Sequence, residues 1–198
     1  MKTVSKTQRS GDRAVFMLTR CSVLTAMSVI LYYIEIPVVA FYKLDLSALP
    51  ALLAGFAMGP LPGFAIVLVK NLIHMLGSST ALVGEFADIL MSGTFVAVAS
   101  IIYRFNKSLK GAILAMAVSV LSMIIAAVLV NYFILIPTYQ HLFHMDVAAI
   151  LSMVGINGVD SLVKLVLMVT APFNLLKGCV ISVITFLLYK RISPLLHQ

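Results

Sequence analysis

Apolar runs long enough to cross a lipid bilayer fill most of this 198-residue chain from Ala14 onward. Charged residues make up only 11% of the sequence, whereas soluble domains carry roughly 25%. No polar stretch is long enough to form a separate soluble domain. The first run, 14–36, is too long for a signal-peptide core and precedes no small-residue cleavage site, so we expect it to be retained as a helix. The sequence therefore predicts one all-α integral membrane domain over residues 1–198.

The boundaries of the spanning helices follow from the length of each apolar run. A hydrocarbon core about 30 Å thick needs roughly 20 apolar residues per helix. The run 46–78 is too long for one span, and Gly59-Pro60-Leu61-Pro62-Gly63 interrupts it. Proline removes a backbone donor and obstructs the preceding turn, so we expect a tight corner there. The predicted helices are 14–36, 46–58, 61–77, 84–103, 111–135 and 173–189. The second is too short to span alone and should be shielded by its neighbours.

Basic residues decide between two arrangements of the chain across the membrane. The stretch 147–171, which Asn157, Asp160 and Lys164 interrupt, could be a span in place of one helix in 46–78. Positive residues favour the cytoplasmic side, and six helices without 147–171 place ten of the fourteen Lys and Arg residues there. These are Lys2, Lys6, Arg9, Arg13, Arg20, Arg104, Lys107, Lys110, Lys190 and Arg191. We therefore predict six spans, cytoplasmic N- and C-termini, and residues 136–171 as an outer re-entrant or surface-lying excursion.

Polar side chains at membrane depth gather near the predicted outer ends of these helices. Such groups are costly in lipid and usually pair, face the bundle interior or line a cavity. They are Lys43, Asp45, Lys70, Asn71, His74, Glu85, Asp88, Asn131, Asn174 and Lys177. Aromatic residues accompany them: Phe41, Tyr42, Tyr132, Phe133, Tyr139 and Phe173. This combination predicts a pocket, open to the outside, for a flat and largely neutral aromatic solute with hydroxyl groups.

Each of these residues also has a purely structural explanation. Glu85 and Asp88 could complement a helix dipole, and Asn131 could join helices by hydrogen bonds. A single histidine such as His74 is more typical of a packing residue than of a metal ligand. The aromatic residues could belong to an interfacial belt. The clustering of Asn131 with Asn174 and Lys177, which share one helix face at i, i+3 spacing, favours the pocket.

Motifs that would indicate an enzyme are missing from the sequence. No G-x-x-x-x-G-K-[ST], H-E-x-x-H or G-x-S-x-G occurs. Cys21 and Cys179 lie in apolar runs, without the spacing of metal ligands or a disulfide framework. The formal charge of +7 reflects the basic cytoplasmic segments rather than a nucleic-acid surface. A helical binder without its own energy source needs partner subunits to transport anything.

Several blocks of the sequence resemble the substrate-binding S components of energy-coupling factor (ECF) transporters. They are Lys43-Leu44-Asp45-Leu46-Ser47, Leu49-Pro50-Ala51-Leu52-Leu53, the Gly59–Gly63 corner, Lys70-Asn71-Leu72-Ile73-His74 and Gly84-Glu85-Phe86-Ala87-Asp88. The blocks Asn131-Tyr132-Phe133-Ile134-Leu135-Ile136-Pro137 and Ala171-Pro172-Phe173-Asn174-Leu175-Leu176-Lys177-Gly178 most resemble the riboflavin-specific members. The resemblance extends from about Thr7 to Ile192 and is weakest over 138–160.

The resemblance implies a vitamin-binding subunit of six transmembrane helices in the cell membrane, with no enzymatic activity, cofactor or metal of its own. Riboflavin is the implied transported ligand. The implied ligand-binding residues are Ala40, Phe41, Lys43, Leu44, Asp45, Glu85, Asn131, Asn174 and Lys177. The loop 40–45 would close over the ligand, and Asn131, Asn174 and Lys177 would supply hydrogen bonds.

The resemblance also implies partner subunits. A membrane-embedded T component and two ATP-binding-cassette ATPase subunits would supply conformational change and energy. The family docks the T component through a small-x-x-x-small motif on the first helix. The matching positions here are Ser22 and Ala26, with serine in place of the usual first alanine. Small side chains at both positions still permit close helix approach.

Other functions remain open at this point. The same fold could bind another vitamin or a flavin nucleotide, although a phosphate group would favour extra basic residues that the sequence lacks. A membrane enzyme would consume its substrate, and a channel would conduct ions. The tight Gly-Pro corner and the absence of a repeated pore motif argue against a channel.

Overall fold

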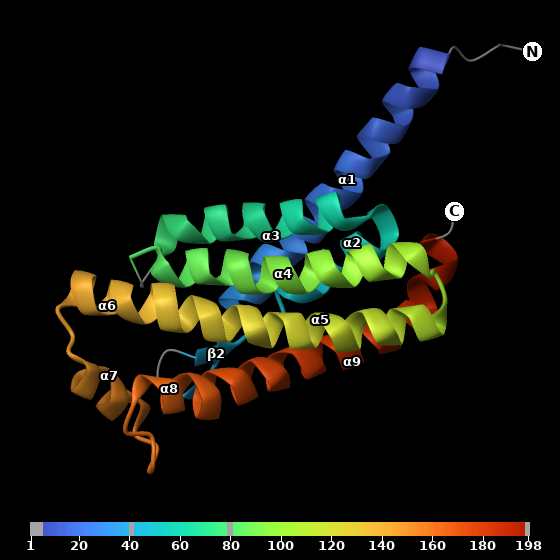
Figure 1. Ribbon diagram of the computed structural model, residues 1–198. Helices are drawn as coiled ribbons and strands as arrows, with labels where there is room; N and C mark the ends of the chain where they lie inside the picture. The colour runs from blue at the N-terminus through green and yellow to red at the C-terminus, as the bar shows by residue number, and fades with distance from the viewer. Residues whose placement is uncertain (1–5, 40–41, 79–80, 197–198) are drawn as a thin grey trace, which may run out of the picture.

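The computed structural model describes residues 6–39, 42–78 and 81–196, most of them helical (Figure 1). The α-helices are α1 (Lys6–Tyr33), α2 (Ala48–Met58), α3 (Pro60–His74), α4 (Val83–Phe105), α5 (Leu109–Val130), α6 (Ile136–Phe143), α7 (Val147–Val154), α8 (Leu162–Leu165) and α9 (Ala171–Leu196). A 3-10 turn, η1 (Met75–Gly77), and two π-helical turns, η2 (Asn131–Leu135) and η3 (Val166–Thr170), adjoin them. Two short strands are β1 (Ile36–Val39) and β2 (Tyr42–Leu44).

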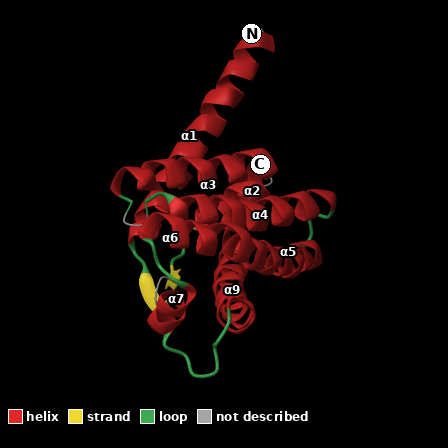
Figure 2. Ribbon diagram, turned by 60° about the vertical axis from the view of Figure 1, so that its left-hand side comes forward, coloured by secondary structure: helices red, strands yellow, loops and turns green. Residues whose placement is uncertain are grey.

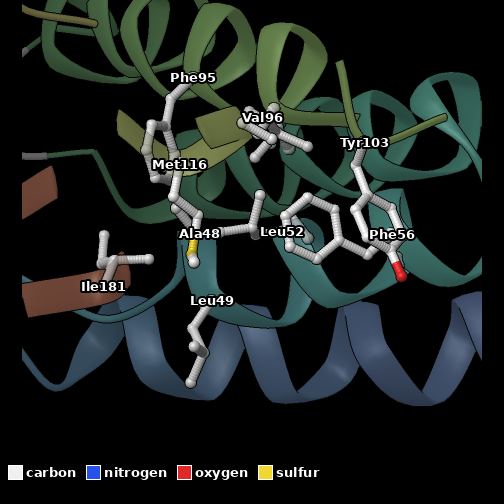
Figure 3. Close-up of a cluster of buried hydrophobic side chains, with 14 of the residues drawn as sticks. Ala48, Leu49, Leu52, Phe56, Phe95, Val96, Tyr103, Met116 and Ile181 are labelled. Atoms are coloured by element: carbon white, nitrogen blue, oxygen red, sulfur yellow. The ribbon is translucent and has the colours of Figure 1, made fainter. Parts of the chain in front are cut away.

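Five helical segments in the described part of the chain are long and apolar enough to cross a bilayer. They are Ala14–Tyr33, Pro60–Gly77, Val83–Phe105, Leu109–Phe143 and Leu162–Leu188. The apolar helix α2 is shorter, and its residues Ala48 to Phe56 are all buried. It packs against α1, α3, α4 and α9, so its neighbours shield it from lipid, as its short length predicted. Figure 3 shows Leu52 and Phe56 of α2 meeting Tyr103 and Val96 of α4 in the core.

The Gly-Pro corner joins α2 to α3 as the sequence predicted. Gly59 has φ 104°, a backbone conformation that favours glycine, and Pro60 opens α3. Gly63 then lies against α2. A Cβ atom added to Gly63 would stand 2.9 Å from the Cα of Gly55 and 3.0 Å from the carbonyl oxygen of Ala51. Because both are backbone atoms, the two helices can approach this closely only with glycine at position 63.

We expect Gly63→Ala to destabilise the protein, because the new methyl group would push α2 and α3 apart. Overpacking of this kind costs about 1–3 kcal/mol, which lowers the melting temperature by roughly 2–4 °C per kcal/mol in a chain of this size. Thermal unfolding in detergent measures the change. Gly77→Ala is the control, since within the described part of the chain its Cβ would meet only the Tyr33 hydroxyl, at 3.9 Å. Equal melting temperatures for the two variants would contradict the packing argument.

Two helices extend further than hydropathy indicated. After α5 the chain continues through η2 and α6 to Phe143, and it re-enters a helix at Leu162 through α8 and η3 before α9. Residues 136–143 and 162–171 therefore prolong spanning helices, and the separate excursion consists of α7 and its flanking loops. Pro137 and Pro172 each follow a π-helical turn. The wider turn accommodates a residue that lacks a backbone donor and would otherwise break the helix.

The connection between α1 and α2 contains a short β-hairpin, so the predicted helical fold is correct except in this segment. β1 and β2 pair antiparallel, with Ile36 opposite Leu44 and Val39 opposite Tyr42, and an irregularity lies between Pro37 and Val39. Branched and aromatic residues favour this extended conformation. The hairpin lies at the same end of the bundle as α6, α7 and α8 (Figures 1 and 2). The beginning of α1, the end of α9 and the α4–α5 connection lie at the opposite end.

Candidate functional site

A cavity opens between the hairpin and the adjoining ends of the long helices. Its lining combines aromatic rings, amides and charged groups from six segments of the chain. The lining residues are Tyr32, Glu35, Tyr42, Lys43, Asp45, His74, Gly84, Glu85, Ala87, Asp88, Met91, Met123, Asn131, Leu135, Phe173, Asn174 and Lys177. The fold thus brings together residues separated by more than 140 positions in the sequence.

Most of the predicted ligand residues meet in this cavity. Lys43, Asp45, Glu85, Asn131, Asn174 and Lys177 all line it. Leu44 is half-buried in β2 and is not among the lining residues. Ala40 and Phe41 lie outside the described residues.

The two amide side chains that line the cavity, Asn131 and Asn174, each form a hydrogen bond with the preceding turn of their own helix. The side-chain nitrogen of Asn131 donates to the carbonyl oxygen of Ala127 at 2.8 Å, and that of Asn174 donates to the carbonyl oxygen of Thr170 at 2.9 Å. Asn131 begins the π-helical turn η2, and Thr170 ends η3. Both amides are almost fully buried. The π-helical turns therefore fix the places where α5 and α9 present their amides to the cavity.

Tyr42 connects the hairpin to both of these helices. Its hydroxyl donates to the side-chain oxygen of Asn131 at 3.4 Å and forms a hydrogen bond with the Thr170 hydroxyl. Its ring packs on Phe173, with centroids 5.2 Å apart. Burial raises the pKa of Tyr42 to about 12, although the hydrogen bond with Thr170 opposes the shift. Tyr42 therefore remains protonated at neutral pH and can donate. The sequence indicated Tyr42 only as one aromatic residue among several.

A closed network of buried charges lies beside the amides, and we call it the charge ring. It consists of Asp45, Ser47, Lys70, Asp88 and Lys177. The Lys177 ammonium lies 2.7 Å from Asp45 Oδ2 and 3.6 Å from Asp88 Oδ1, while Lys70 lies 2.9 Å from Asp88 Oδ2. Lys70 also donates to the Ser47 hydroxyl, and Ser47 donates to Asp45 through its backbone N–H at 2.9 Å and through its hydroxyl. The ring joins the end of the hairpin to α3, α4 and α9.

The charge ring keeps Asp45 ionised despite its burial. Burial alone would raise the pKa of this carboxyl, but the ammonium groups of Lys177 and Lys70 outweigh it and hold the pKa below the usual value. The two carboxylates and two ammonium groups of the ring balance in formal charge. Such a set tolerates burial only while every member keeps a partner.

Glu85, one helical turn before Asp88 on α4, forms a second polar cluster in the cavity. One carboxylate oxygen lies 2.8 Å from Nδ1 of His74, and the other accepts a hydrogen bond from Ser78 at 2.9 Å. The His74 ring also packs against Tyr32, with centroids 4.1 Å apart. His74 therefore orients a carboxylate and an aromatic ring. Within the described residues no group of three His, Cys, Asp or Glu side chains is placed to hold a metal ion.

Each carboxylate that lines the cavity contacts a basic side chain of the protein. The four lining carboxylates are Glu35, Asp45, Glu85 and Asp88, and they contact Lys43, Lys177, His74 and Lys70. A ligand with a negative group would face these carboxylates, and no lysine of the lining lacks a carboxylate partner. The site is therefore suited to an uncharged molecule with an aromatic body and several polar atoms.

Comparison with known proteins identifies the family. Residues 16–189 match the family described as "ECF transporter, substrate-specific component". The chain belongs to this family. Its members are transporter subunits, and this one is accordingly a multi-pass protein of the cell membrane rather than an enzyme. The family predicted from the sequence blocks is confirmed.

Relatives with assigned names extend the comparison over most of the chain. The chain is 34% identical over 185 residues to "Riboflavin transporter RibU" of Staphylococcus aureus (strain TCH60), covering 91% of this chain and 92% of that protein. It is 26% identical over 184 residues to "Riboflavin transporter FmnP" of Bacillus subtilis (strain 168), covering 89% and 92%.

A solved structure agrees with the fold. It is described as "Structure and mechanism of the S component of a bacterial ECF transporter" and superposes with a TM-score of 0.72 at 34% identity. The match covers 93% of this chain and 99% of that one. The architecture described above is therefore that of an S component.

Proposed function

We propose that this protein is the riboflavin-binding S component of an ATP-driven ECF uptake transporter. The main support for the proposal is the cavity next to the hairpin. Asn131, Asn174 and Lys177 line this cavity together with Tyr42 and Asp45. The riboflavin transporters among its relatives support the choice of ligand.

The chemistry of the cavity matches both parts of riboflavin. The isoalloxazine ring has an aromatic body, which Tyr42 and Phe173 can pack against, and a polar edge of donors and acceptors, which amides such as Asn131 and Asn174 can match. The ribityl chain carries hydroxyl groups that can donate to Glu85 or Asp45 and accept from Lys177 or Lys43. The hairpin segment around Ala40, Phe41 and Leu44 would close over the ligand.

The topology that we propose has six membrane-spanning helices with both termini in the cytoplasm. The short helix α2 is the sixth, in addition to the five longer segments. The beginning of α1 and the end of α9 lie at one end of the bundle (Figure 1), as an even number of crossings requires. Arg104, Lys107 and Lys110 also lie at that end, and basic residues favour the cytoplasm. The cavity then faces outward, where a vitamin would be captured.

Transport would require the partners that the family implies. We propose that a membrane-embedded T component and two ATP-binding-cassette subunits complete the transporter. Ser22 and Ala26 are exposed on α1 and line a groove that α1 forms with Ala65 and Val69 of α3. Only 6% of the residues in the apolar stretch of α1 are buried, so this helix has exposed surface for a partner in the membrane.

Riboflavin should bind the purified protein saturably, and flavin mononucleotide should bind at least about tenfold more weakly. The nucleotide carries the same ring but would place its phosphate among the four carboxylates of the cavity, and like charges brought together cost several kcal/mol. Quenching of flavin fluorescence on titration into protein in detergent or nanodiscs measures both affinities. Absence of saturable riboflavin binding would overturn the proposed function. Tighter binding of the nucleotide would favour the alternative of a flavin-nucleotide carrier.

A further inference from the structure

The charge ring contains members that reach the cavity and members that do not. Asp45, Asp88 and Lys177 line the cavity, whereas Lys70 and Ser47 are not among its lining residues. Lys70 has no exposed surface at all, and its ammonium group lies 4.3 Å from the centre of the Tyr32 ring. Burial of a lysine is costly unless the charge is fully compensated. Lys70 cannot be explained by direct contact with a ligand in this cavity.

The distances within the ring suggest what Lys70 does. Asp88 is shared between two lysines, with Lys70 at 2.9 Å and Lys177 at 3.6 Å. Because Lys70 occupies the nearer position, Lys177 makes its shorter contact with Asp45, at 2.7 Å. Asp88 also accepts hydrogen bonds from Asn71 at 2.9 Å and Ser92 at 2.7 Å. Asp88 is therefore a fixed anchor on α4 whose charge Lys70 largely satisfies.

The contact between Lys177 and Asp45 joins α9 to the end of the hairpin. Asp45 follows β2 directly, and it also accepts the backbone N–H of Ser47 at 2.9 Å. The position of the Lys177 ammonium group therefore has two effects. It determines whether the cavity contains this hydrogen-bond donor, and it determines whether the hairpin end is tied to α9 through Asp45. Lys70 contacts Asp88 and, through the Ser47 hydroxyl, is also linked to Asp45, although Lys70 itself does not line the cavity.

We propose that Lys70 and Asp88 are positioning residues for ligand capture: together they keep the Lys177 ammonium at Asp45, so that Lys177 faces the ligand and the hairpin end stays tied to α9. This inference rests on the proposed function, because the ligand it concerns is riboflavin. Lys70 satisfies Asp88 and so frees Lys177 for the cavity. Asp88 in turn compensates the buried Lys70.

Removing Lys70 alone should release the hairpin end. In Lys70→Met, the charge of Asp88 is left to Lys177, which then moves across the 3.6 Å separation and away from Asp45. Riboflavin should dissociate about tenfold faster or more, since loss of one partner of a buried charge pair mainly raises the dissociation rate. Asp88→Asn should have a comparable effect, because two lysines then compete for Asp45.

The double variant Lys70→Met/Asp88→Asn provides the decisive comparison. It removes one charge of each sign and leaves Lys177 and Asp45 as the remaining ion pair of the ring, with Ser47 still donating to Asp45. We expect its riboflavin dissociation rate to return to within about threefold of the wild type, so the two substitutions together should do less harm than either alone. A purely structural role also allows compensation, because removing only one partner leaves an uncompensated buried charge. In that case the losses and the recovery would appear in the melting temperature, and the riboflavin dissociation rate would stay unchanged in all three variants.

The experiment measures riboflavin dissociation by stopped-flow fluorescence for the wild type, both single variants and the double variant, alongside the melting temperature without ligand. Lys164→Met is the matched control, since it breaks the exposed Lys164–Asp160 pair outside the cavity. Where a single variant does not fold, Ser47→Ala decides: it cuts the link between Lys70 and Asp45 without changing charge, and should raise the dissociation rate several-fold.

The outcomes separate this inference from the proposed function. Single variants that change only the melting temperature, or a double variant as fast as the singles or faster, would overturn the positioning role while leaving riboflavin binding intact. Wild-type protein that does not bind riboflavin would overturn the proposed function itself and this inference with it.

Discussion

Replacing Lys177 by methionine should weaken riboflavin binding by about a hundredfold or more. The side chain is almost fully buried and contacts two carboxylates, Asp45 at 2.7 Å and Asp88 at 3.6 Å. Its loss removes a donor from the cavity and leaves excess negative charge where riboflavin carries electron-rich oxygens. Truncating one partner of a buried, hydrogen-bonded charge pair costs about 2–5 kcal/mol, and 1.4 kcal/mol corresponds to tenfold in affinity.

Lys43→Met is the matched comparison for Lys177→Met. Lys43 also lines the cavity and pairs with a carboxylate, Glu35, but both side chains are about one-third exposed. An exposed pair contributes about 0–1 kcal/mol, so we expect no more than about a fivefold loss of affinity. Titration by flavin fluorescence measures both variants. Equal losses would show that burial does not decide the contribution of these lysines and would contradict the electrostatic account of the site.

The long-range organisation of the membrane domain could be predicted from the sequence because it depends on local chemistry. Long apolar runs require helices in lipid, and Gly59 with Pro60 requires a corner. Burying polar side chains in lipid costs free energy, so these side chains pair with one another or line a cavity. For that reason the positions of Asn131, Asn174 and Lys177 in the sequence indicate a pocket.

The helix ends and the hairpin could not be predicted from hydropathy, because they depend on local backbone geometry and on tertiary contacts. The predicted helices ended at residue 135 and began at residue 173, yet π-helical turns allow the chain to remain helical through Pro137 and Pro172. A sequence pattern cannot distinguish a proline that ends a helix from one that follows a wide turn. The hairpin strands are only three and four residues long, and their pairing depends on the position of the bundle beneath them.

The sequence also could not predict which lysine pairs with which carboxylate in the charge ring. The sequence does not specify which acid Lys70 contacts, because Asp45, Glu85 and Asp88 all belong to the same set of polar residues. Lys177 and Asp45 are 132 positions apart, and only the packing of α9 beside the hairpin brings them together. Tyr42 was likewise one of several aromatic residues until its hydroxyl was placed between Asn131 and Thr170.

Ala26→Trp should reduce riboflavin uptake by the assembled transporter by at least about tenfold while leaving riboflavin binding by the isolated subunit unchanged. Ala26 is exposed on α1, about 9 Å along the helix from Tyr32, and it is not among the residues that line the cavity. Close packing of membrane helices depends on small residues at the contact, and a tryptophan would hold the T component away from Ser22 and the rest of this face. Uptake is measured in cells or proteoliposomes that contain all subunits, and binding is measured on the purified chain.

Ala117→Trp is the control for this experiment, because Ala117 is also an exposed alanine in a spanning helix, on α5 and away from α1. If docking uses the α1 face, the control should retain uptake. Loss of uptake in both variants would indicate that a large side chain anywhere on the membrane surface impairs the protein. Normal uptake with Ala26→Trp would exclude the Ser22–Ala26 face as the docking site. Riboflavin binding and transporter uptake are measured separately in these two variants. The comparison therefore also tests whether the cavity and the α1 face act independently of each other.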